Sequence, residues 1–277
     1  MGQVADARLR VAWIHTSSVK GMALAETDAI HLDAAGPPGD RQFALIDATR
    51  RVINGANLGG GLSTFRASYD AGTSELRIKP PDGGPLRGRV AGGGTVVVAL
   101  GGRQVDARLA PGPWDGLLTD RFGQWLRMVR FERPGLGLDR SYAADGGVTL
   151  LSRSSLGRLA EVAGSGPVDP RRFRMTFGID GADPFEEDGW IGRPIRVGEA
   201  IVMPLGHVGR CVVTTHNPDT GMGDLDTLRI LARLRRGAAT TERVSLGIWG
   251  RVELPGLVRV ADAITPISGR AERLGSR

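Results

Sequence analysis

Short apolar runs separated by glycine and proline characterise the first half of the chain. They predict strands at Leu9–Ile14, Gln42–Ile46, Phe65–Tyr69, Glu75–Lys79, Thr95–Leu100 and Gln104–Leu109. Strands of this length and spacing are typical of a barrel or a sandwich. Between Trp114 and Met128 the apolar residues recur every three to four positions, which predicts one amphipathic helix there.

A glycine-containing stretch from Arg133 to Gly147 interrupts this pattern and predicts a linker between two domains. Beyond it, Ser152 or Ser154 is suited to cap a helix, and a further helix is predicted at Leu225–Arg235. The remaining apolar runs predict strands at Arg174–Ile179, Ile195–Val197, Ala200–Pro204, Arg210–Thr215, Val244–Val252 and Val258–Val260. The fold class expected is mainly β with a few helices (α+β), divided into domains at residues 1–135 and 136–277.

The composition favours an ordinary globular protein, because 41% of the 277 residues are hydrophobic and 24% are charged. The longest clean apolar stretch, Thr95–Leu100, is much shorter than the ~20 residues that cross a bilayer. Residues Met1–Trp13 contain no continuous apolar segment of the kind that signal peptides have. We therefore expect a cytoplasmic protein without a membrane partner.

Arginine accounts for nearly all of the positive charge. Of the 36 basic residues only Lys20 and Lys79 are lysines, and the formal net charge is +6. A planar, permanently charged guanidinium suits phosphate and carboxylate ligands, although the same bias is expected from genomic base composition alone. Aromatic residues make up only 5%, with no interleaving of aromatic and basic positions, which disfavours a nucleic-acid partner.

The single cysteine, Cys211, excludes an internal disulfide and any cysteine-held iron–sulfur cluster within this sequence. A free cysteine is commonly a buried, inert apolar residue. Arg210 and the turn Asn217–Gly221 instead favour a reactive thiolate near a loop, and the residues by themselves leave both interpretations open. A metal site of His207, Cys211 and His216 is disfavoured, since strand residues at these separations do not share a face.

The glycine-rich tract at residues 55–61 lacks the Lys-Ser/Thr pair of a phosphate-binding loop. The helix Leu225–Arg235 also carries a group of basic residues, which form either a docking surface for an acidic electron donor or a solvated surface. These residues are Arg229, Arg233, Arg235 and Arg236.

Several segments of the second half occur together in the order and spacing of one known family. They are Arg172-Phe173-Arg174-Met175-Thr176-Phe177, Asp180–Gly192, Val197-Gly198-Glu199, Arg210-Cys211-Val212-Val213-Thr214-Thr215 and Pro218-Asp219-Thr220-Gly221. This series resembles the MOSC domain. Upstream, Val19-Lys20-Gly21 and Gly39–Asp47 resemble the β-barrel domain that precedes MOSC in the amidoxime-reducing and YcbX-like branch. The resemblance implies an N-terminal β-barrel-like domain followed by a MOSC β-barrel domain.

The resemblance also implies a molybdenum cofactor of the molybdopterin type. By the match, Cys211 is the catalytic residue and the protein ligand to molybdenum, and a soft thiolate suits such a metal. The residues expected to bind the cofactor are Lys20, Arg41, Ser154, Ser155, Arg174, Thr176 and Arg210. The sequence departs from the family at Gly21, where relatives have Ser or Thr, and at Met175-Thr176, where they have Pro-Asn. The acidic cluster Asp183–Asp188 is expected to be structural.

The function expected is therefore a molybdopterin-dependent reductase of N-hydroxylated or N-oxygenated small molecules. Electrons would come from a separate flavin or iron–sulfur protein. Two alternatives stay open: a sulfurtransferase that carries a persulfide on Cys211, and a cofactor carrier without turnover.

Overall fold

Alternating buried and exposed positions produce strands through most of the chain, as the sequence predicts. The computed structural model describes residues 8–132 and 147–267. Its strands are β1 Arg10–Thr16, β2 Ala25–Glu26, β3 Ala29–Leu32, β4 Phe43–Ile46, β5 Arg66–Asp70, β6 Glu75–Lys79, β7 Leu86–Arg89, β8 Thr95–Leu100, β9 Arg103–Leu109, β10 Arg127–Arg130, β11 Val148–Ser152, β12 Phe177–Asp180, β13 Ile195–Val197, β14 Ala200–Gly209, β15 Ser245–Leu254, β16 Gly256–Arg259 and β17 Ile264–Pro266. The α-helices in this part of the chain are α1 Pro113–Phe122, α2 Arg153–Ala163 and α3 Thr227–Leu234. The mainly β fold class is confirmed.

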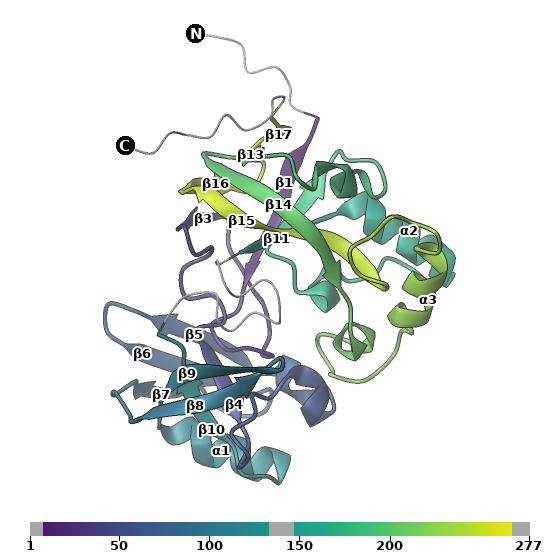
Figure 1. The fold of residues 1–277 in the computed structure, drawn as a ribbon. Coiled ribbons are helices and arrows are strands. Elements are labelled where there is room, and N and C mark those ends of the chain that lie inside the picture. Colours follow the sequence, from purple (N-terminus) through teal and green to yellow (C-terminus); the bar gives the residue numbers. More distant parts are fainter. Residues whose placement is uncertain (1–7, 133–146, 268–277) are drawn as a thin grey trace.

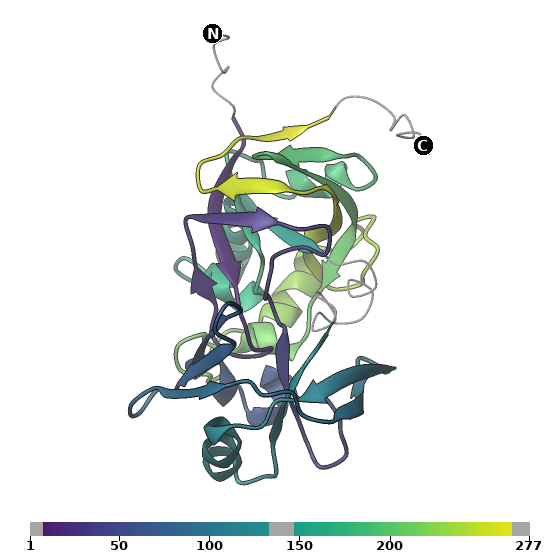
Figure 2. The same cartoon turned by 90° about the vertical axis from the view of Figure 1, so that its left-hand side faces the viewer.

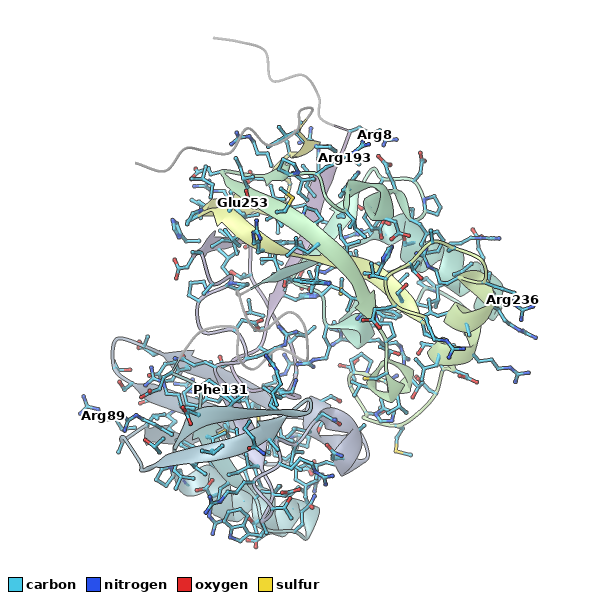
Figure 3. The ribbon with its side chains drawn as sticks, viewed as in Figure 1. Arg8, Arg89, Phe131, Arg193, Arg236 and Glu253 are labelled. Atoms are coloured by element: carbon cyan, nitrogen blue, oxygen red, sulfur yellow. The ribbon has the colours of Figure 1, made fainter. Side chains whose placement is uncertain are left out.

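The elements form two lobes, one above the other in both views (Figures 1 and 2). In the first lobe, the sheet β4-β10-β9-β8 and the sheet β5-β6-β7 enclose an apolar core together with α1. Phe131, labelled in Figure 3, is fully buried there. The aromatic and aliphatic side chains of this core give the first lobe an interior of its own.

The second lobe is built on the sheet β17-β13-β14-β15-β11-β12-β1-β2. All neighbouring strands are antiparallel except β11 and β12, which are parallel and are connected through α2. Backbone hydrogen bonds also join β1 to the residues before β17, from Val11 N–H to Asp262 and from Ala261 N–H to Val11. The sheet therefore curls round towards a barrel, with α2 and α3 on one side (Figure 1).

The first strands of the chain belong to the second lobe. β1 pairs with β12, and β3 pairs with β16, so these two strands join strands that come after residue 147, while Val19 and Met22 between them pack in the core of the first lobe. The predicted boundary between residues 135 and 136 lies outside the described residues and stays a prediction. The predicted linker at 133–147 lies there too, except for Gly147.

Two predicted elements differ most from the structure. The helix expected over residues 114–128 ends at Phe122, because Gly123 adopts the left-handed conformation with φ 64°, and β10 follows it. The prediction of a strand at residues 210–215 is wrong. After β14 ends at Gly209, residues Val212–Thr215 form the 3₁₀ turn η6. The hydroxyls of Thr214 and Thr215 donate to the carbonyls of Cys211 and Val212, and these local bonds favour a turn over a strand.

Candidate functional site

A pocket lies where loops of the first lobe meet the segment 171–174 and the residues after Cys211 in the second. It contains about 730 Å³ of empty space, part of it open to solvent. The first lobe lines it with Gly21, Ala23, Leu24, Gly55, Gly60, Ser63, Thr64 and Arg66, and the second with Arg171, Arg172, Arg174, Val213, His216, Pro218 and Asp219. Charged side chains thus come mainly from the second lobe.

The first lobe contributes closely packed backbone to this pocket. Residues 55–64 form two 3₁₀ turns, η1 Gly55–Leu58 and η2 Gly61–Thr64, and the Asn54 side chain accepts hydrogen bonds from the first. Gly60, between them, has φ +82°, and a Cβ there would lie 2.7 Å from His216 Nδ1 and would collide with the Gly221 carbonyl. Glycine is required at this position because the two lobes approach each other so closely.

The arginines of the second lobe are held in place by carboxylates. They lie on and after the 3₁₀ turn η4 Pro170–Phe173, where the Asp169 side chain caps the Arg171 N–H. The Arg171 guanidinium donates to both carboxylate oxygens of Asp219, at 2.8 and 2.7 Å, and also to Asp169. Arg172, whose side chain is 8% exposed, donates to Asp224 at 2.7 Å. These bonds fix the positions of the guanidinium groups before any ligand binds.

The pocket is positively charged. The hydrogen bonds from Arg171 and Arg172 lower the pKa values of Asp219 and Asp224, respectively, so both carboxyls are ionised at neutral pH. Only Asp219 of these two lines the pocket, together with Arg66 and the three arginines of the second lobe. An excess of cations in a concave site favours an anionic ligand.

Cys211 is exposed and immediately precedes η6. Its carbonyl accepts hydrogen bonds from the N–H and the hydroxyl of Thr214, at 3.1 and 3.0 Å. Val213, two residues further on, lines the pocket and lies within contact distance of where a Cβ on Gly55 would be. The interpretation of Cys211 as a buried residue is wrong, because Cys211 is exposed, two residues before Val213 of the pocket lining.

Comparison with known proteins identifies the second half of the chain. The MOSC domain matches residues 137–265. This chain contains a MOSC domain. All the pocket residues from Arg171 to Asp219 lie in the MOSC domain, whereas the glycine-rich turns of the pocket precede it.

Curated relatives match about a third of this chain. The mitochondrial amidoxime reducing component 2 of Homo sapiens and that of Macaca fascicularis are each 34% identical over 98 residues, which is 33% of this chain and 29% of the relative. The mitochondrial amidoxime-reducing component 1 of Xenopus laevis is 32% identical over 107 residues, covering 35% and 30%. The chain therefore matches less than a third of the length of these relatives.

Solved structures give weaker similarities. The YUAD protein from Bacillus subtilis aligns with 92% of this chain and 94% of its own, at 11% identity and a TM-score of 0.41. YiiM from Geobacillus stearothermophilus aligns with 44% of this chain and 56% of its own, at 15% identity and a TM-score of 0.33. Scores below 0.5 do not establish a shared fold, so the assignment of the MOSC domain rests on the sequence match.

Three of the predicted cofactor-binding residues lie at or directly behind the pocket. Arg174 lines it in a left-handed conformation with φ 53°, and its carbonyl accepts a 2.9 Å hydrogen bond from Arg41. Arg41 also forms a buried ion pair with Asp40. Lys20 is buried next to Gly21, and its backbone N–H donates to the Phe43 carbonyl at 2.7 Å. Their contacts with a cofactor stay predictions.

Arg210 is half-buried and donates to the backbone of the MOSC domain. Its guanidinium donates to the carbonyl of Phe173 at 2.8 Å and to that of Leu246. These bonds connect the residue before Cys211 to the end of η4 and to β15. Arg210 thereby fixes the point where the chain leaves β14 and reaches the cysteine.

The predicted residues Ser154, Ser155 and Thr176 are not among the described residues that line the pocket. Ser155 is fully buried and donates to Glu187 at 2.9 Å, and Ser154 donates to Ser152, the cap of α2. Thr176 is also buried. Its hydroxyl lies 3.2 Å from that of Thr149. These hydroxyls have partners inside the MOSC domain, and their predicted role at a cofactor stays a prediction.

Glu187 and Asp188 of the acidic cluster contact the interior of the MOSC domain, whereas Asp183 is exposed. Glu187 is fully buried in η5 (Glu186–Trp190), and burial raises the pKa of its carboxyl. Asp188 forms an ion pair with the buried Arg235 and lies 3.4 Å from His207. Within residues 8–132 and 147–267, no cluster of three or more His, Cys, Asp or Glu side chains is arranged to hold a metal ion.

The arginines at α3 separate into two groups. Arg235 packs over Phe185 and pairs with Asp188, so this residue is not part of a basic surface. Arg229, Arg233 and Arg236 are exposed, and Arg236 projects from the end of α3 (Figure 3). No helix in the described part of the chain is long and apolar enough to cross a membrane. The cytoplasmic location stays a prediction.

Arg66, Arg171, Arg172 and His216 line the pocket and were not predicted as site residues. Arg172 stands in the same family motif as Arg174, and His216 directly follows the Cys211 segment, so both carried a signal in the sequence. Arg66 carried none, because it lies on β5, far away in sequence from the residues that it joins.

Proposed function

We propose that this protein binds a molybdenum cofactor through its MOSC domain and reduces N-oxygenated small molecules with electrons from a separate donor protein. The observation that carries the proposal is the exposed Cys211, directly before the turn that contributes Val213 to a pocket with four arginines. The match to the MOSC domain and the names of the amidoxime-reducing relatives support it.

The residues of the pocket fit such a cofactor. The Arg172 Nε and His216 Nδ1 atoms are buried and have no hydrogen-bond partner within the described structure. A buried N–H left without an acceptor costs about 1–3 kcal/mol, so the Arg172 donor is suited to an acceptor on a ligand. Arg66, Arg171, Arg172 and Arg174 would hold the phosphate of the cofactor, and the Cys211 thiolate would bind molybdenum.

When bound, the cofactor supplies two-electron chemistry that removes the oxygen from a nitrogen–oxygen bond. The chain itself provides the charge and the orientation. Asp169 and Asp219 hold the Arg171 guanidinium from two sides, and Asp224 holds that of Arg172. Groups fixed in this way need no reorganisation when an anion arrives, so more of the contact energy contributes to binding.

The test is molybdenum analysis together with fluorescence of the oxidised pterin, on protein made in a host that synthesises the cofactor. We expect about one molybdenum per chain in the wild type. The Cys211→Ser variant is expected to lose molybdenum and the reduction of benzamidoxime but to keep pterin, because the arginines still bind the phosphate. Full activity in Cys211→Ser would exclude the proposed ligand.

The sulfur-transfer alternative makes a different prediction for the same residue. It requires a persulfide on Cys211 after incubation with a cysteine desulfurase, visible as added mass on that residue alone. Neither the relatives' names nor the charge of the pocket favours it. Wild-type protein without molybdenum or pterin, but with a persulfide on Cys211, would replace the reductase proposal by this one.

A further inference from the structure

His216 lies in the pocket, five residues after Cys211, at the end of η6. Its backbone N–H donates to the Val213 carbonyl at 3.2 Å, and it forms an isolated bridge with Gly223. Its imidazole ring lies between two glycines. A Cβ on Gly60 would lie 2.7 Å from Nδ1, and one on Gly223 would lie 3.8 Å from Cδ2. With Nδ1 and Cδ2 beside these two glycines, Nε2 lies on the remaining edge of the ring, and His216 is one of the residues that line the pocket.

The packing around Nδ1 bears on which nitrogen of the His216 ring carries a proton. His216 Nδ1 is buried, has no hydrogen-bond partner in the described structure and faces the Cα of Gly60. A hydrogen on Nδ1 would point at the hydrogens of Gly60, whereas a lone pair there forms a weak contact with them. The contact with Gly60 thus favours the tautomer with its lone pair on Nδ1, and in that tautomer Nε2–H is the donor.

The other donors around the pocket are charged or already paired. The Ser63 hydroxyl donates to Gly60 at 3.0 Å, and that of Thr64 donates to Gly61 at 2.8 Å. The remaining side-chain donors among the described lining residues are the arginines, which prefer anions. His216 thus supplies the uncharged side-chain donor of the pocket that is not occupied by the protein itself.

We propose that the Nε2–H of His216 donates a hydrogen bond to the oxygen of the N–O group in the substrate and selects N-oxygenated molecules over their deoxygenated products. This inference rests on the proposed function. A neutral donor matches the neutral oxygen of an N-hydroxyl group, while the arginines are left for the anionic cofactor. A site that hydrogen-bonds a substrate oxygen binds an analogue without it less well, because the donor is left unpaired.

The first test uses nitrogen-15 NMR of the histidine rings in the cofactor-loaded protein without an electron donor. The chain has four histidines, so substitution assigns each ring signal. We expect His216 to show an unprotonated Nδ1 and a protonated Nε2, and benzamidoxime to shift the Nε2 signal more than benzamidine does. A proton on Nδ1, or a His216 signal that does not respond to benzamidoxime, would overturn the proposal.

The second test compares two variants that differ in the donor. His216→Leu removes it, and His216→Gln places an amide N–H near the position of Nε2. We expect the KM for benzamidoxime to rise about three- to tenfold in His216→Leu, the range for one neutral hydrogen bond, with a smaller change in kcat. His216→Gln is expected to restore most of this loss. His31→Gln, which changes an exposed histidine on β3, is the control for the substitution itself.

Molybdenum content is measured in every variant, which separates the two proposals. An unchanged KM in a His216→Leu variant that retains molybdenum overturns the role of His216 alone. Wild-type protein without molybdenum overturns the proposed function and the role of His216 with it. A raised KM in His216→Leu that Gln does not restore would also count against a hydrogen bond at Nε2.

Discussion

The MOSC domain contains two groups of buried polar side chains, which differ in whether the protein itself supplies their hydrogen-bond partners. In the interior, Ser152, Ser155 and Glu187 bond to one another and to nearby backbone. In the pocket, the Arg172 Nε and His216 Nδ1 atoms are as well buried but have no partner among the described residues. The first group is largely satisfied by the fold, whereas in the second the Arg172 Nε–H is left to donate to a ligand.

The predicted cofactor-binding residues are divided between these two groups. Ser155 belongs to the interior group and Arg174 to the pocket, although both stand in segments that resemble the same family. A buried hydroxyl with two protein partners stabilises the fold, since removing it would leave those partners unpaired. A guanidinium in an open pocket contributes to stability far less and to ligand binding far more. Substitutions in the interior group should therefore lower stability without weakening ligand binding, and substitutions in the pocket should do the reverse.

The largest effect is expected at Gly60, where the two lobes meet. Gly60→Ala adds a Cβ against the Gly221 carbonyl in a left-handed conformation, and we expect a loss of about 2–4 kcal/mol in the free energy of unfolding, together with loss of the cofactor. Gly59→Ala is the matched control. Gly59 has φ +60°, but a Cβ there meets nothing within 4 Å, so only about 1 kcal/mol is expected. Urea unfolding measures both, and equal losses would show that strain alone matters.

The next effect separates the interior group from the pocket directly. Ser155→Ala leaves the Phe185 N–H without its acceptor and removes one of the hydrogen bonds to the buried Glu187, and should lower stability by about 1–3 kcal/mol without lowering the molybdenum content per folded chain. Arg66→Gln changes an exposed pocket residue, and should change stability by less than about 0.5 kcal/mol but weaken retention of the cofactor. Loss of molybdenum in folded Ser155→Ala would place Ser155 in the site after all.

The smallest effect is a pH dependence that arises in the interior group. Burial raises the pKa of Glu187 above its usual value near 4.5, so the folded protein holds this proton more tightly than the unfolded chain does. The contribution of Glu187 to stability is thus fully present below pH 4.5 and is lost as the pH rises through the raised pKa. Each tenfold change in proton affinity corresponds to about 1.4 kcal/mol.

Glu187→Gln removes the titrating group while it keeps an oxygen that can accept from Ser155. We expect this variant to lose less stability than the wild type between pH 4.5 and 8, measured by urea unfolding at a series of pH values. Identical pH profiles for the two proteins would show that other carboxyls cause the dependence. The pocket is expected to be unaffected, with unchanged molybdenum content per folded chain at neutral pH.

The sequence predicted much of the fold because local patterns carry that information. The strands β5, β6, β8 and β9 lie within one residue of their predicted ends, since alternating side chains and glycine turns define them locally. The predicted helix over residues 114–128 is longer than α1, which ends at Phe122. Its end depends on Gly123 and on the pairing of β10 with β4 and β9. Pairing between distant strands leaves little local signal.

The sequence also determined the family of the second half, because its motifs are contiguous and specific, and it predicted Cys211 as the metal ligand. Only the tertiary structure decided that Cys211 precedes a 3₁₀ turn rather than lying within a strand, and that its side chain is exposed. It also decided that Gly60, Arg66 and His216 meet around one pocket. These residues lie up to 156 positions apart, and the packing of two lobes, rather than any local pattern, brings them together.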